Sequence, residues 1–128
     1  MTDPIWLDEA IILAIHASMI ERYGGSPGIR DEGLLASAMN RPRNRWAYET
    51  PELVELAAAY AFGISSNHPF IDGNKRTGLM AAYTFLRLNG YRLVASEPEA
   101  VVMIRDLAAG EIDEAAIAAW IAASAEAV

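Results

Sequence analysis

Hydrophobic residues recur at helical spacing along most of the chain. In the first such stretch the inward-facing positions follow an i, i+3, i+4, i+7 pattern. These positions are Ile12, Ile15, His16, Met19 and Tyr23. The pattern predicts a helix that begins near Asp8 and ends at Gly24-Gly25, because glycine readily adopts the left-handed conformation of a helix C-terminus. His16 lies on the apolar face, so it is expected to be a hydrogen-bonded core histidine.

The second and third helices are predicted from capping residues and further periodic stretches. Asp31 can cap a short helix that carries Leu34, Leu35 and Ala38 and is expected to stop before Pro42. Residues 41–50 show no helical period and are expected to form a loop or short hairpin. Thr50 before Pro51 then favours a helix start. The buried face of this third helix carries Leu53, Leu56, Ala57, Tyr60, Ala61 and Ile64.

A polar segment separates this helix from the next one. Pro69 disfavours helical backbone at His68. The period resumes with Leu79, Ala82, Tyr83 and Leu86 and ends at Asn89-Gly90. Residues 68–74 are therefore expected to connect two buried helices. The segment "YRLV" at 91–94 suggests a short extended piece, and residues 97–109 and 113–125 predict two more helices.

These elements predict an all-α fold: a compact bundle of about six helices, with the polar loop between two central ones. A chain of 128 residues is large enough to form one core, so residues 1–128 are expected to be a single domain. No apolar run approaches the roughly 18 residues of a membrane span. The acidic N-terminus lacks the features of a secretory signal, and a cytoplasmic location is expected by default.

Composition and charge narrow the classes of function. A net charge of −7 argues against a general nucleic-acid binder, which needs a basic face. The chain has no cysteine, which excludes disulfide scaffolds and thiolate metal sites. Cations nevertheless gather at Arg41, Arg43 and Arg45, and at Lys75 and Arg76. Such clusters indicate either a site for a small anion or an ordinary solvated surface.

The loop "NHPFIDGNKRTG" at 67–78 concentrates reactive side chains where a helix begins. Unpaired N–H groups at a helix N-terminus suit phosphate, and Gly73 and Asn74 lie at that point. Lys75 and Arg76 oppose the helix dipole there, which suggests that an anionic ligand offsets their cost.

Two further side chains of the loop have the chemistry of a transfer site. His68 can act as a general base near neutral pH. Asp72 offers a hard oxygen ligand for Mg²⁺. The spacing of Gly73 and Gly78 imitates a P-loop, but Leu79 and Met80 stand where lysine and a hydroxyl residue are required, so that motif is excluded.

The sequence of residues 68–77, "HPFIDGNKRT", resembles the signature of the Fic/Doc superfamily, and specifically its death-on-curing branch. The stretches "RYGGSPGIRDEGLLASAMNRP" and "TFLRLNGYRL" also resemble that branch, so the likeness covers about residues 5–95. It implies an all-α fold, ATP and Mg²⁺ as cofactors, and transfer of part of a nucleotide to a protein hydroxyl.

The resemblance also implies roles for individual residues. His68 would remove the proton of the accepting hydroxyl, Phe70 would anchor the loop, and Asp72 would hold the metal. The implied catalytic set is His68, Asp72, Lys75 and Arg76. The implied phosphate-binding set is Gly73, Asn74, Lys75, Arg76 and Thr77.

Two departures from the adenylylating Fic pattern bear on the reaction. Lys75 replaces a glycine that gives room to the transferred group, and Leu79 replaces a second arginine. Lysine here resembles the death-on-curing toxins, which deliver the γ-phosphoryl group. A protein kinase is therefore favoured over the alternatives, which are an adenylyltransferase and a catalytically silent binding module.

Targets and partners follow from the resemblance alone. In that branch the substrate is a threonine of elongation factor Tu, so the expected protein is a translation-inhibiting toxin of a type II toxin–antitoxin system. An antitoxin would insert its C-terminal segment into a groove of the toxin; no self-inhibiting [S/T]-x-x-x-E-[G/N] motif occurs in the chain. No direct nucleic-acid or membrane contact is expected. Residues 41–48 lie where that branch has a flap that positions the target chain, or they form an ordinary mobile loop. The candidate flap residues are Arg43, Arg45, Trp46 and Tyr48.

Overall fold

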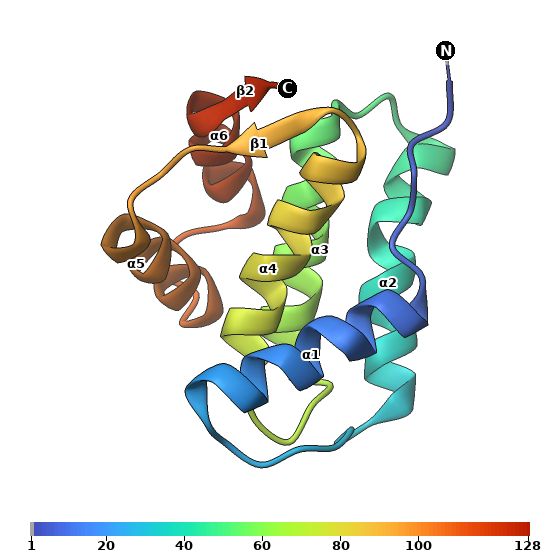
Figure 1. The fold of residues 1–128 in the computed structure, drawn as a ribbon. Helices are drawn as coiled ribbons and strands as arrows, with labels where there is room; N and C mark the ends of the chain where they lie inside the picture. The colour runs from blue at the N-terminus through green and yellow to red at the C-terminus, as the bar shows by residue number, and fades with distance from the viewer. Residues whose placement is uncertain (1) are drawn as a thin grey trace.

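The computed structural model describes residues 2–128, which form six α-helices and one two-stranded antiparallel sheet (Figure 1). In chain order the elements are α1 (Glu9–Tyr23), α2 (Glu32–Tyr48), α3 (Leu53–Asn67), α4 (Asn74–Leu88), β1 (Tyr91–Leu93), α5 (Glu97–Ala108), α6 (Glu114–Ser124) and β2 (Ala125–Ala127). The prediction of an all-α fold of about six helices is confirmed. None of the helices in the described range is long and apolar enough to cross a membrane.

Helices α3 and α4 lie side by side at the centre of the molecule. Figure 1 shows α2 on one side of this pair, α5 and α6 on the other, and α1 crossing one end. Small residues let the central helices approach closely, because a Cβ added at Gly78 of α4 would lie 3.0 Å from the carbonyl oxygen of Ala61 in α3. The rings of Tyr60 and Phe85, both fully buried, pack across the pair with centroids 5.2 Å apart. The loop that joins α3 to α4 is thereby held between two rigid elements.

Helix α2 is longer than the sequence predicts. It continues through Pro42 to Tyr48, so the expected loop or hairpin at 41–50 is wrong. A proline inside a helix loses one backbone hydrogen bond and typically costs about 3 kcal/mol. Here Pro42 is buried, and Arg45, one turn later, pairs with carboxylates of α3 and α6. These tertiary contacts offset the local cost, and a single-sequence pattern does not reveal them.

Two other element ends differ from the expectation. Helix α3 is capped by Glu52, whose side chain and that of Glu55 form a capping box, rather than by Thr50. The last helix ends at Ser124, and residues 125–127 pair with β1, Leu93 opposite Ala125 and Tyr91 opposite Ala127. The expected extended piece at "YRLV" is confirmed as β1, but its partner was missed because "AEA" has no strand signal.

Close packing of α3 on α2 depends on Gly63. A Cβ at this position would lie 3.1–3.2 Å from the backbone and Cβ of Ala38. We expect Gly63→Ala to lower the free energy of unfolding by about 1 kcal/mol, because overpacking outweighs the gain in helix propensity. Urea denaturation measures this change.

The matched control is Gly33→Ala near the start of α2. Its added Cβ meets only the side-chain oxygen Asp31 Oδ1 at 3.3 Å, and this oxygen also accepts the capping hydrogen bond from the N–H of Leu34. We expect this variant to change the free energy of unfolding by less than about 0.5 kcal/mol, because the gain in helix propensity offsets a small shift of the cap. Equal changes in the two variants would contradict the packing argument.

Candidate active site

The loop of residues 68–73 joins α3 to α4 at one end of the bundle (Figure 1). His68 caps α3 in the left-handed conformation, with φ 51° and ψ 55°, and its side chain is solvent-exposed. Gly73 precedes α4, also with a positive φ of 76°. The chain thus turns at both ends of the loop and presents the N-terminus of α4 to solvent beside His68.

The side chain of Asn74 closes the loop on itself. Its Oδ1 accepts a hydrogen bond from the N–H of Phe70, and its Nδ2 donates to the carbonyl oxygen of Phe70, both at 2.9 Å. Asn74 is buried, and so is Phe70. The side-chain amide of Asn74, which was expected to bind phosphate, is therefore already hydrogen-bonded within the loop. The backbone N–H of Asn74 is the group of this residue that can donate to a ligand.

His16 of α1 contacts the loop through its ring and through one hydrogen bond. Its ring stacks on Phe70 with centroids 3.8 Å apart and an interplanar angle of 6°. Its Nε2–H donates to the backbone carbonyl of Asp72 at 2.8 Å, since a carbonyl can only accept. The expectation of a buried, hydrogen-bonded histidine is confirmed, and the structure adds that its partner is the loop itself.

The connection between α1 and α2, residues 24–31, runs along the same loop and is here called the strap (Figure 1). The N–H groups of Arg30 and Asp31 donate to the carbonyl of Pro69 at 2.7 and 3.1 Å, and the N–H of Ile71 donates to the carbonyl of Gly28 at 3.1 Å. These bonds pair the strap with the loop in a short antiparallel bridge, Ile29 opposite Phe70.

A side chain of the strap also binds the end of α3. The Nε of Arg30 donates to the carbonyl of His68 at 2.7 Å, and its Nη2 donates to the carbonyl of Asn67 at 2.9 Å. Sequence reasoning missed Arg30, because nothing local to residue 30 indicates partners 37 and 38 residues away.

The strap also orients Asp72. Its Oδ1 accepts from the N–H of Gly73 at 2.9 Å, and its Oδ2 accepts from the N–H of Ser26 at 3.3 Å. Only glycine fits at position 25, where φ is 117° and a Cβ would lie 2.7 Å from Asp72 Oδ2. The carboxylate is therefore fixed by two backbone donors while its side chain lies at the surface.

The loop borders a cavity of about 450 Å³, a size typical of small-molecule sites. Its lining residues are His68, Ile71, Asp72, Gly73, Asn74, Lys75, Arg76, Leu79, Val101, Ile104 and Arg105. One wall is thus the loop and first turns of α4, and the other is α5. Most predicted site residues are brought together here. Among the predicted catalytic and phosphate-binding residues Thr77 is the exception, because its side chain is fully buried and cannot contact a phosphate in the cavity.

The cavity is cationic within an acidic protein. Lys75, Arg76 and Arg105 line it against the single carboxylate of Asp72. The guanidinium of Arg76 lies 4.3 Å from the ring centroid of Tyr23 on α1, a cation–π contact that restrains it. Arg105 was not anticipated, because its stretch of sequence carries only a helix signal. The arrangement suits an anionic ligand.

A divalent metal would find one protein carboxylate in this cavity. Among residues 2–128 no group of three or more histidine, cysteine, aspartate or glutamate side chains is placed to hold a metal by itself. One carboxylate, that of Asp72, is compatible with Mg²⁺, because this ion commonly binds one or two carboxylates together with substrate phosphates and water.

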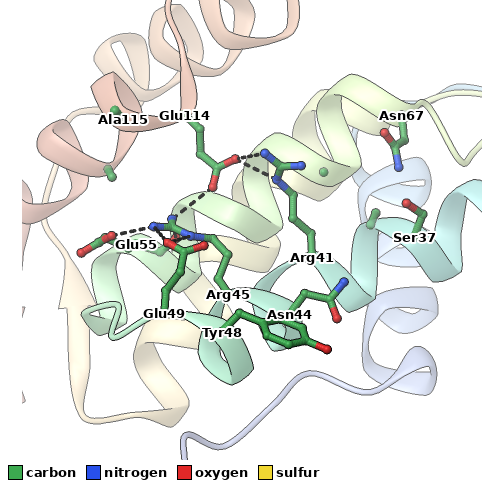
Figure 2. A pocket seen from close by; sticks show the side chains of 13 residues that line it. Ser37, Arg41, Asn44, Arg45, Tyr48, Glu49, Glu55, Asn67, Glu114 and Ala115 are labelled. Atoms are coloured by element: carbon green, nitrogen blue, oxygen red, sulfur yellow. Dashed lines mark hydrogen bonds and ion pairs between the residues drawn. The ribbon is translucent and has the colours of Figure 1, made fainter.

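The candidate flap residues lie elsewhere. Arg45 lines a separate cavity of about 750 Å³ between α2, α3 and α6, where Glu114 pairs with both Arg41 and Arg45 at 2.6 and 3.2 Å (Figure 2). Arg45 also pairs with Glu55 at 2.7 Å. Burial alone would lower the pKa of Arg45, but hydrogen bonds and charges of the surrounding glutamates more than reverse this and raise it. The guanidinium of Arg45 therefore connects α2 to α3 and α6 through ion pairs.

The other three candidate flap residues are also part of helix α2. The guanidinium of Arg43 lies 5.2 Å from the ring centroid of Trp6, and the ring of Trp46 packs edge-on against Trp6 at 6.4 Å. Tyr48 is 87% exposed, and Arg43 is also exposed. The expected loop conformation of the flap is corrected to two helical turns, in which Trp46 packs on Trp6.

Comparisons with known proteins agree with the geometry. The model of a family described as "Fic/DOC family" matches residues 6–86. The chain is 39% identical over 108 residues to a protein named "Protein kinase doc" from Escherichia phage P1, covering 84% of this chain and 85% of that protein. It is also 39% identical over 111 residues to "Toxin Doc" of Mycolicibacterium smegmatis, covering 82% and 84% of the two chains.

Two substitutions of His16 can separate the contribution of its stack on Phe70 from that of its hydrogen bond to the Asp72 carbonyl. We expect His16→Phe to keep the stack on Phe70 but lose the hydrogen bond to Asp72, which lowers the free energy of unfolding by about 1 kcal/mol. His16→Ala loses the stack as well and leaves a cavity, for a total near 3 kcal/mol. Urea denaturation of both variants checks this order. Equal losses would show that the stack contributes nothing.

Proposed function

Because the chain belongs to the Fic/Doc family, we propose that it is an ATP- and Mg²⁺-dependent protein kinase and the toxin of a toxin–antitoxin pair. The observation that carries the proposal is the single cavity that joins His68, Asp72, the N-terminus of α4 and three cations. A general base, a metal carboxylate and a cationic phosphate site are the parts that phosphoryl transfer needs.

The residues of the cavity have distinct tasks in this reaction. The N–H groups at the start of α4, with Lys75 and Arg76, bind the phosphates and offset their charge. His68 accepts the proton of the attacking hydroxyl, whose oxygen bonds to the γ-phosphorus as the bond to the β-phosphate oxygen breaks and ADP leaves. Mg²⁺ held by Asp72 would supply charge neutralisation on the phosphates.

The apolar part of the cavity suits the rest of the nucleotide. Ile71 and Val101 are about half exposed, at 56% and 49%, and both line the cavity. Covering such apolar surface with a base or ribose is favourable. The cavity therefore offers a cationic part for phosphates and an apolar part for the nucleoside.

Transfer of the γ-phosphoryl rather than the AMP group is favoured by Lys75. Its side chain lies in the first turn of α4 and lines the cavity, where it occupies space beside the phosphates. The name of the phage relative, a protein kinase, supports the same choice. Leu79, one turn after Lys75, adds no charge for a further phosphate.

For the biological setting we propose a threonine of elongation factor Tu as the acceptor, so that the reaction halts translation in the cytoplasm. The relative named as a toxin supports this setting. Inhibition would come from a separate antitoxin that inserts its C-terminal segment into a groove of this chain.

The reaction can be identified by the position of the label. Incubation with γ-labelled ATP, Mg²⁺ and purified elongation factor Tu is expected to label the factor. His68→Ala is expected to reduce labelling by roughly 10²- to 10⁴-fold, the usual contribution of a general base. Arg92→Gln, which breaks only an exposed ion pair with Glu126, is the matched control and should retain activity.

Two results would contradict this assignment. Label from α-labelled ATP on the target would indicate adenylyl transfer. Undiminished toxicity of His68→Ala in cells, with no nucleotide turnover by the wild type, would indicate a binding module that acts without catalysis.

The role of α5 in nucleotide binding has its own test. We expect Arg105→Gln to raise KM for ATP about tenfold with kcat nearly unchanged, since one charge-assisted contact to a phosphate typically contributes 1.5–3 kcal/mol. Steady-state kinetics measure both constants. An unchanged KM would show that Arg105 lines the cavity without touching the nucleotide.

A further inference from the structure

We propose that Arg30 is a positioning residue that holds His68 in the orientation required of a general base. The inference rests on the proposed function, in which His68 receives the proton of the acceptor. It starts from the two hydrogen bonds that the Arg30 guanidinium donates to the carbonyls of Asn67 and His68, at 2.9 and 2.7 Å.

The backbone of His68 needs such support. His68 is the one residue other than glycine among residues 2–128 with a positive φ. A residue with a Cβ is strained in this left-handed conformation and keeps it only when its surroundings impose it. The same backbone angles direct the imidazole, so a change at this residue would turn the side chain away from the cavity.

Few contacts within α3 itself can impose this conformation. The N–H of His68 donates to the carbonyl of Ile64 at a long 3.3 Å, and the last turn of α3 contains no basic residue. Arg30 supplies from another segment both donors for the terminal carbonyls and a positive charge at the negative end of the helix dipole.

Arg30 is itself held in place by the backbone. Its N–H donates to the carbonyl of Pro69 at 2.7 Å, and the next residue, Asp31, caps α2 by accepting the N–H of Leu34 at 2.9 Å. The guanidinium therefore connects the start of α2 to the end of α3. The planar fork of arginine spans two neighbouring carbonyls, whereas the single ammonium of lysine is a point donor.

The effect on catalysis is expected to separate kcat from KM. In Arg30→Gln we expect kcat for phosphoryl transfer to fall about 10- to 100-fold, the scale of an ångström-sized misplacement of a reacting group. KM for ATP should stay within about twofold, because the phosphate-binding residues of α4 are unchanged. Arg30→Lys, which keeps the charge but not the fork, should lie between Gln and wild type. Arg92→Gln controls for loss of a surface arginine.

A second measurement needs no nucleotide. Amide ¹⁵N relaxation of the free protein is expected to show ordered amides at Asn67 and His68 in the wild type and order parameters below about 0.6 at these two residues in Arg30→Gln. Residues 70–72 should stay ordered in both proteins, because their bonds to Asn74, the strap and His16 do not involve the Arg30 side chain. Thermal unfolding confirms that each variant is folded at the assay temperature. If Arg30→Gln does not fold, Arg30→Lys carries both measurements.

The outcomes are distinct. A loosened segment together with a lower kcat and constant KM supports the proposal. Unchanged loop order in Arg30→Gln overturns it, and so does a loosened loop with wild-type kcat. If the wild type itself transfers no phosphoryl group, the proposed function fails, whereas the relaxation data still show whether Arg30 fixes the loop; a rigid loop in Arg30→Gln would then overturn that part independently.

Discussion

The arrangement of the site depends on the pairing of the strap with the loop between α3 and α4. Backbone hydrogen bonds join Pro69 and Ile71 to the strap, and the stack of His16 on Phe70 supports the same loop from α1. Phe70 anchors the loop in the core, whereas the side chains of His68 and Asp72 are exposed, so their positions depend on hydrogen bonds from neighbouring segments. Here three separate stretches of chain, α1, the strap and the end of α3, contact the loop that carries His68 and Asp72 before any ligand binds. The proposed transfer reaction would require such preorganisation.

The central helices provide the second condition. Because α3 and α4 pack closely at Gly78, the N-terminus of α4 has a fixed place relative to the end of α3. The partial positive charge of that N-terminus is then added to Lys75 and Arg76. Helix α5 lines the same cavity as the loop and the start of α4, and it contributes Val101, Ile104 and Arg105. The candidate catalytic side chains lie in residues 68–76, and the cavity beside them is completed by Leu79 of α4 and by α5.

Two groups of cationic side chains differ in the carboxylates that surround them. Those at 41 and 45 are neutralised by Glu114 and its neighbours and hold α2 against α3 and α6 (Figure 2). Lys75 and Arg76 face a cavity whose lining contains one carboxylate, so an acidic protein retains a local site for an anion. Arg105 borders the same cavity but also pairs with the neighbouring Asp106 at 3.5 Å. Two clusters of basic residues cannot be told apart from the sequence. The carboxylates that pair with their side chains in the structure determine which cluster can bind an anionic ligand.

The sequence by itself determined the helical bundle, the loop between the two central helices and the motif that places the chain in its family, because periodicity, capping and a contiguous signature are local properties. The tertiary structure decided the rest. It carried α2 through Pro42, paired residues 125–127 with β1, buried Thr77, and brought Arg30 to His68 and His16 to Asp72 across 38 and 56 residues. Each of these outcomes rests on contacts between distant segments, whose energies a local pattern does not contain. The candidate reactive side chains lie in one short stretch of sequence, whereas His16 and Arg30, which contact that stretch, lie 56 residues before Asp72 and 38 residues before His68.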